Sequence, residues 1–125
     1  MKANRPVLVI EDDIDVRRLL VERVQKDGYR TLEAASGEEG LDMARRETPC
    51  LVLLDLLLPE MTGWEVLARL RSEEAFADTP VVIVSILDEV FPHPVIEGYM
   101  IKPFRAADVH SVLEEFADHR EEETK

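Results

Sequence analysis

Apolar and polar positions follow two different periods along the chain. Four short apolar runs each end at a polar residue: Val7–Ile10 before Glu11, Leu51–Leu54 before Asp55, 81–84 before Ser85, and 99–101 before Lys102. Apolar runs of this length, rich in aliphatic residues, are typical of buried strands. A mixed run at 29–34 has strand character too. The pattern therefore predicts five strands.

Segments of helical period separate these strands. Apolar residues recur at helical spacing over Ile14–Lys26, 64–71 and 106–118. Ser36 followed by Glu39 predicts a capping box for a further helix that ends near Arg46. Alternating strands and helices are typical of a doubly wound α/β sheet, so we expect five βα units.

The segment between the last two strands departs from this regularity. It contains Pro92 and Pro94, and proline disrupts helix hydrogen bonding. We therefore expect the fourth helix to be short, irregular or missing.

The polar strand ends carry the candidate chemistry. Open α/β sheets bind ligands outside the carboxyl ends of their strands, where Glu11, Asp12, Asp55, Ser85 and Lys102 are expected to meet. Three neighbouring carboxylates repel one another, and a hard cation such as Mg2+ offsets that repulsion. Each residue alone has a simpler interpretation, such as a solvated turn or a helix cap. Their joint placement favours a site for Mg2+ and a phosphoryl group.

Composition restricts the classes of function. The 125 residues, 46% of them hydrophobic, suit one domain, with a folded core expected over about 5–118 and a charged tail at 119–125. The formal charge of -12 repels nucleic acid and anionic lipid, so we expect no direct binding to nucleic acid or membrane. No apolar run reaches the roughly 18 residues of a membrane span, and no signal peptide is evident, so a cytoplasmic location is expected. Cys50, the single cysteine, is expected to be a buried free thiol.

Four motifs, in their order and spacing, resemble the receiver domain of two-component response regulators, including the chemotaxis type. They are VLVIEDD at 7–13, LVLLDLLLPEMTGWEVL at 51–67, PVVIVS at 80–85 and GYMIKPF at 98–104. The resemblance implies a flavodoxin-like parallel sheet with strand order 2-1-3-4-5. It also implies a phosphorylation-controlled switch in which Asp55 accepts a phosphoryl group from a histidine kinase or a histidine phosphotransfer protein, with an unknown protein downstream.

The resemblance also assigns roles at the metal. The expected direct ligands of Mg2+ are Asp12, Asp55 and the backbone carbonyl of Leu57, with Glu11 acting through water.

Other roles concern the phosphoryl group and the switch. Lys102 and Ser85 are expected to contact the phosphoryl oxygens, and the peptide bond between Lys102 and Pro103 is expected to be cis. Ser85 and Tyr99 are the expected switch pair, in which the aromatic ring swings inward when the hydroxyl moves toward the phosphate.

Some positions depart from the family pattern. Ile86 replaces a small residue and could crowd the phosphoryl site, while Glu97 and Gly98 replace the usual Gly-Ala turn in a segment roughly five residues shorter than usual. These departures suggest an altered output surface, and they leave open a degenerate receiver that binds partners constitutively. Leu57 and Leu87 cannot activate water, so we hypothesise slow hydrolysis of the aspartyl phosphate.

An enzyme is the less favoured class. Phosphatases of the haloacid dehalogenase type also use an aspartate nucleophile with Mg2+, but they need a second aspartate two residues later, where this chain has Leu57. The three histidines, His93, His110 and His119, have no metal-ligand spacing and are expected at the surface.

Overall fold

A computed structural model describes residues 5–86 and 96–117 of the chain. It contains a five-stranded parallel sheet with the order β2-β1-β3-β4-β5, which confirms the predicted α/β fold and strand order. The elements are β1 (Val7–Ile10), α1 (Ile14–Lys26), β2 (Thr31–Ala34), α2 (Gly37–Glu47), β3 (Leu51–Leu54), α3 (Gly63–Ser72), the short 3-10 helix η1 (Glu74–Phe76), β4 (Val81–Ser85), β5 (Gly98–Ile101) and α4 (Ala106–Phe116).

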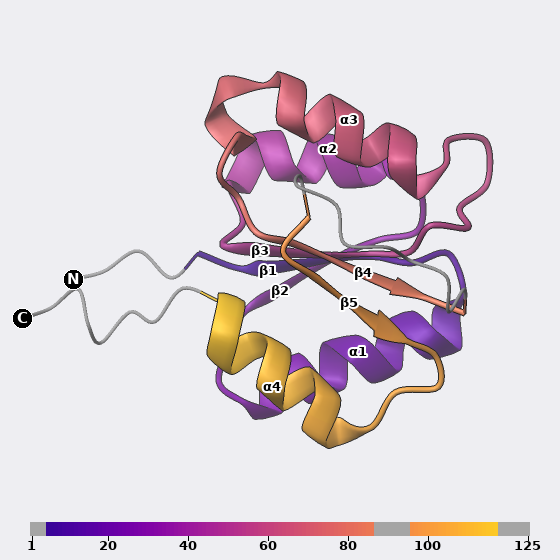
Figure 1. Ribbon diagram of the computed structural model, residues 1–125, viewed down its shortest axis with the longest axis vertical. Helices are drawn as coiled ribbons and strands as arrows, with labels where there is room; N and C mark the ends of the chain where they lie inside the picture. The colour runs from indigo at the N-terminus through magenta and orange to yellow at the C-terminus, as the bar shows by residue number, and fades with distance from the viewer. Residues whose placement is uncertain (1–4, 87–95, 118–125) are drawn as a thin grey trace, which may run out of the picture.

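Two layers of helices cover the sheet, α2 and α3 on one face and α1 and α4 on the other (Figure 1). The helix labelled α4 is the one expected after the last strand. The prediction of an irregular fourth helix falls on residues 87–95, which lie outside the described residues, as does the whole of the expected tail.

The central strands are apolar on both sides because each face of the sheet is covered. In β1, Leu8 and Ile10 pack toward α2 and α3, while Val7 and Val9 pack toward α1 and α4. Successive side chains of a strand point to opposite faces, so a strand buried on both faces is a continuous apolar run. Cys50 is buried in the core, as predicted.

The helix starts are capped by nearby side chains. Asp13 caps α1 by accepting hydrogen bonds from the backbone N–H groups of Asp15 and Val16. Ser36 caps α2 as predicted, but Glu39 reaches back to the N–H of Ala35, so the predicted capping box is only half formed.

A complete capping box starts α3, and the sequence analysis missed it. Thr62 accepts from the N–H of Glu65, whose carboxylate accepts from the N–H of Thr62. The helix consequently begins at Gly63, one residue earlier than expected. None of the helices in the described residues is long and apolar enough to cross a membrane.

Candidate functional site

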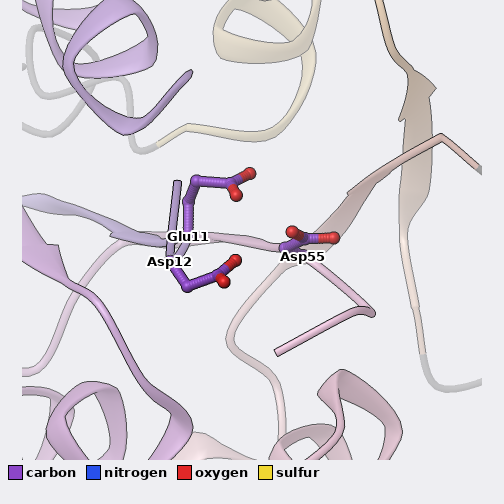
Figure 2. Close-up of side chains that lie close together, drawn as sticks. All are labelled: Glu11, Asp12 and Asp55. Atoms are coloured by element: carbon purple, nitrogen blue, oxygen red, sulfur yellow. The ribbon is translucent and has the colours of Figure 1, made fainter. Parts of the chain in front are cut away.

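The carboxyl ends of β1 and β3 bring three acidic side chains together. Glu11 and Asp12 follow β1, and Asp55 follows β3 beside it (Figure 2). One carboxylate oxygen from each residue lies within 4.8 Å of the others. Glu11 and Asp55 are buried, whereas Asp12 is exposed. The acidic cluster predicted at this edge is therefore present.

Lys102 enters the same cluster from the end of β5. Its Nζ lies 2.8 Å from Glu11 Oε1 and 3.3 Å from Asp55 Oδ2. The peptide bond from Lys102 to Pro103 is cis, as predicted. The ammonium group therefore faces the two buried carboxylates.

Backbone groups hold the buried carboxylates in place. The N–H of Leu57 donates to Asp55 Oδ1 at 3.1 Å, and the N–H of Asp13 donates to Glu11 Oε2 at 3.2 Å. These bonds fix one oxygen of each carboxylate while Lys102 contacts the other. Both carboxylates thus face the cluster in defined orientations.

The loop after Asp55 folds tightly onto the start of α3. The N–H of Gly63 donates to the carbonyl of Leu56 at 2.9 Å. A Cβ at Gly63 would collide with the backbone carbonyl oxygen of Asp55 and lie 2.7 Å from Leu56 Cα. Only glycine allows this close approach of helix and loop.

Burial and charge shift the ionisation of the cluster. Burial is the main cause that raises the pKa of Glu11 to about 7; the contact with Lys102 opposes this rise, and the nearby charge of Asp55 adds to it. Burial acts to lower the pKa of Lys102, but the contacts with Glu11 and Asp55 outweigh it and the pKa is raised. One ammonium thus leaves the three carboxylates with negative charge in excess.

The donor chemistry of the cluster fits Mg2+. All three side chains offer carboxylate oxygens, which hard cations prefer, and no thiolate or imidazole from the described part of the chain joins them. Burial makes the charged form of the Glu11 carboxylate less favourable, and a divalent cation nearby would offset that cost. The exposed Asp12 leaves one side of the cluster open to solvent, which suits an ion that keeps several waters.

The remaining predicted residues lie around the cluster. Ser85 is buried at the end of β4, while the side chain of Tyr99 on β5 is exposed. Ile86 is 60% exposed. Together with Lys102, Phe104 and residues of α1, it lines an apolar pocket of about 300 Å3. Leu57 is also exposed, and Leu87 lies outside the described residues.

Arg17 supports the cluster from α1, and the sequence analysis missed it. Its side chain is 13% exposed, with Nη1 donating to the backbone carbonyl of Glu11 at 2.9 Å and Nε forming an ion pair with Glu33 at 3.1 Å. In the sequence Arg17 and Arg18 are adjacent residues of the same type. Only the helix phase relative to β1 determines which of them faces the site.

The described histidine lies away from the acidic cluster. His110 Nδ1 on α4 lies 2.8 Å from Asp27 Oδ2, beyond the end of α1, and its side chain is exposed as predicted. His93 and His119 lie outside the described residues.

A flavodoxin-like sheet with an acidic cluster and a lysine at its carboxyl edge defines a class of α/β domain that binds phosphoryl groups or nucleotides there. Residues 7–114 match the response regulator receiver domain. The chain belongs to this family, the phosphoacceptor switch domains of two-component systems.

Individual relatives agree with this assignment. The chain is 34% identical over 110 residues to "Probable transcriptional regulator ycf27" of Porphyridium aerugineum, covering 84% of this chain and 45% of that protein. It is 33% identical to "Polar-differentiation response regulator DivK" of Brucella ovis, covering 80% and 85%. Chemotaxis protein CheY4 of Vibrio cholerae has a similar structure, with a TM-score of 0.81, 25% identity, and coverage of 91% and 99%. The chain thus spans about half the length of the first curated relatives it matches.

Proposed function

We propose that this domain is a phosphorylation-controlled signalling switch in which Asp55 accepts a phosphoryl group in a Mg2+-dependent reaction. One observation carries the proposal: the buried Asp55 carboxylate lies between the ammonium of Lys102 and the N–H of Leu57, with carboxylate oxygens of Glu11 and Asp12 close by. The donor would be a histidine kinase or a histidine phosphotransfer protein.

Asp55 would act as the nucleophile. An oxygen of its ionised carboxylate attacks the phosphorus of a phosphohistidine, so no general base is needed. The new O–P bond forms as the P–N bond breaks, and the electron pair of that bond leaves with the imidazole nitrogen, which takes up a proton. Lys102 would neutralise charge on the transferring oxygens, and the Ser85 hydroxyl would donate a hydrogen bond to one of them.

The acidic residues would hold the metal. Asp12, Asp55 and the backbone carbonyl of Leu57 are the proposed direct ligands, and Glu11 would act through water. Mg2+, when bound, supplies positive charge that offsets both the carboxylates and the phosphoryl oxygens.

The surface beside the site suits a protein donor. Ile86, which is 60% exposed, lines an apolar pocket together with Phe104 and Lys102, and Ile14 is 53% exposed at the start of α1. Exposed apolar side chains grouped around a reactive group are typical of a surface that binds another protein. Because the chain carries a charge of -12, its own surface is not proposed to bind nucleic acid.

The response to phosphorylation would pass through Ser85 and Tyr99 to a downstream protein. Ser85 is buried at the end of β4, and Tyr99 is 45% exposed on the neighbouring strand, from which its ring would swing inward in the phosphorylated state.

A fluorine NMR titration with beryllofluoride tests the phosphoacceptor proposal without a kinase. Beryllofluoride mimics a phosphoryl group on aspartate, so we expect a bound signal that requires Mg2+ and is lost in Asp55→Asn. A folded wild-type protein that gives no bound signal would contradict the proposal. That outcome would favour a degenerate receiver that binds its partners constitutively.

A further inference from the structure

Glu97 ties the start of β5 to the start of β4. Its Oε1 accepts a hydrogen bond from the N–H of Val81 at 2.6 Å, and its own N–H donates to the carbonyl of Val81 at 2.9 Å. Both polar backbone groups of Val81 are thus bound by one residue. This tie lies at the opposite end of the strands from the acidic cluster.

Arg71, in the last turn of α3, joins the same tie. Its Nη2 forms an ion pair with Glu97 Oε1 at 3.1 Å, and its Nη1 donates to the carbonyls of Phe76 and Thr79 at 2.9 and 2.8 Å. The Arg71 side chain is only 14% exposed. A single guanidinium therefore connects α3, the segment that leads into β4 and the residue before β5.

These contacts lie at the start of an edge strand. β5 has four residues and, among the described strands, pairs with β4 alone, where Val82 is aligned with Gly98. At the far end of β5, the N–H of Lys102 donates to the carbonyl of Ser85 at 2.8 Å. A slip of one residue would turn every side chain of a strand to the other face. The position of Lys102 thus depends on how Glu97 holds the start of the strand.

We propose that Glu97 and Arg71 are positioning residues for the phosphoacceptor site, because they hold β5 in the register that places Lys102 beside Asp55. The inference rests on the proposed role of Asp55 as phosphoacceptor. Neither residue touches the acidic cluster, and both act through the strand.

The chain contains a matched control for this pair. Arg45 and Glu73 form an ion pair of 2.7 Å on the same side of the sheet, and among the described residues their side-chain contacts do not involve β5. The two glutamates are similarly exposed, but Arg45 is 47% exposed whereas Arg71 is 14% exposed. Exposed pairs contribute little to stability, whereas a mostly buried guanidinium paired with a carboxylate that also accepts a backbone N–H is a stronger interaction.

The test compares two affinities in the same proteins. Trp64, the single tryptophan, follows Gly63 in the first turn of α3, next to the loop after Asp55, so its fluorescence reports Mg2+ binding. Beryllofluoride affinity is followed by fluorine NMR at saturating Mg2+, and both affinities are measured in Glu97→Ala, Arg71→Ala and the control Glu73→Ala. Lys102 contacts the phosphoryl mimic, whereas the metal ligands follow β1 and β3. We expect the first two variants to weaken beryllofluoride binding about tenfold without weakening the binding of Mg2+, with the control unchanged in both. Glu97→Gln keeps an acceptor for the N–H of Val81 and should recover most of the loss.

Other outcomes would overturn the inference. Equal losses in the two affinities would indicate general destabilisation, and unchanged beryllofluoride binding would show that the tie does not position Lys102. If Glu97→Ala fails to fold, Arg71→Lys carries the same test, because lysine keeps the charge but lacks the fork that reaches the two carbonyls with one nitrogen and Glu97 with the other.

A measurement without ligand separates this inference from the proposed function. The NOEs between the backbone of Lys102 and that of Ser85 report the β4–β5 register directly, and we expect them to weaken in Glu97→Ala but not in Glu73→Ala. A wild-type protein that binds no beryllofluoride would refute the phosphoacceptor role alone. Unchanged NOEs in Glu97→Ala would refute the positioning role alone.

Discussion

The ammonium of Lys102 lies 2.8 Å from Glu11 Oε1, so a residue after β5 pairs with a residue after β1 across the two strands between them. Asp55 Oδ2 is farther from the same nitrogen, at 3.3 Å. Lys102 thus offsets part of the repulsion within the acidic cluster. Its ammonium would compete with a metal ion for the carboxylates, whereas it would attract a phosphoryl group.

Replacing Lys102 should therefore have opposite effects on two ligands. In Lys102→Met the cluster loses a cation, so Mg2+ should bind several-fold more tightly, while beryllofluoride should bind at least tenfold more weakly. Titrations of the two ligands, with Mg2+ saturating in the second, measure both effects. Weaker binding of Mg2+ would show that Lys102 organises the metal ligands instead of competing with the metal.

Leu57 should make the phosphorylated domain long-lived. Its side chain is 52% exposed beside Asp55, and a leucine can neither orient nor activate an attacking water. After phosphorylation by a small acyl phosphate, Leu57→Gln should lose its phosphoryl group several-fold faster than wild type. The decay is measured by separating the two forms on phosphate-binding gels. A wild-type phosphoprotein that decays as fast as the glutamine variant would contradict the hypothesis.

Gly63→Ala should damage the site through the backbone. The added Cβ would collide with the carbonyl of Asp55, which cannot move aside as a flexible side chain could. We expect the free energy of unfolding to fall by about 1–3 kcal/mol and the amide signals around Asp55 to shift. Ala68→Gly, on the exposed face of the same helix, should cost about 1 kcal/mol without shifting those signals. Equal shifts in both variants would point to the helix instead of the loop contact.

Arg17 should contribute more to stability than its neighbour. Arg17→Ala removes a charged donor to the carbonyl of Glu11 and the ion pair with Glu33, so the free energy of unfolding should fall by about 1–2 kcal/mol. Arg18→Ala is the matched control, since Arg18 is exposed on the same helix and its loss should cost less than about 0.5 kcal/mol. Urea denaturation measures both. Equal costs would exclude a supporting role for Arg17.

His110 should titrate above an ordinary histidine. The hydrogen bond and charge of Asp27 raise its pKa, and Glu114, 3.9 Å away on the same helix, adds to the effect. The stabilisation from this contact is complete below the pKa of the unfolded chain, near 6.5, and is lost as pH rises through the folded pKa. NMR titration of the imidazole measures the pKa, which should fall in Asp27→Asn. An unchanged pKa in that variant would exclude Asp27 as the cause.

Much of the fold could be read from local sequence patterns. The apolar runs of β1, β3 and β4 are continuous because these strands are buried on both faces, and the alternation with helical segments indicates a parallel sheet. The complete capping box at Thr62 and Glu65 was also present in the sequence as a residue pattern, although it was not used. Such signals depend on residues a few positions apart.

The acidic cluster was predictable for a related reason. Once the strands are parallel, topology alone brings their carboxyl ends to one edge, so Glu11, Asp55 and Lys102 had to lie near one another. Which carboxylate Lys102 approaches more closely was not predictable. That choice depends on distances of tenths of an ångström that packing sets.

The sequence by itself determined the strand and helix order, the parallel sheet and the set of residues at its carboxyl edge, because each depends on local periodicity and on a topology with few alternatives. Only the tertiary structure decided the supporting contacts. Glu97 and Arg71 are 26 positions apart, and His110 and Asp27 are 83 positions apart. No local pattern links such pairs, since their contact depends on how separate elements pack against one another. The sequence thus names the residues of the site, and packing decides what holds them in place.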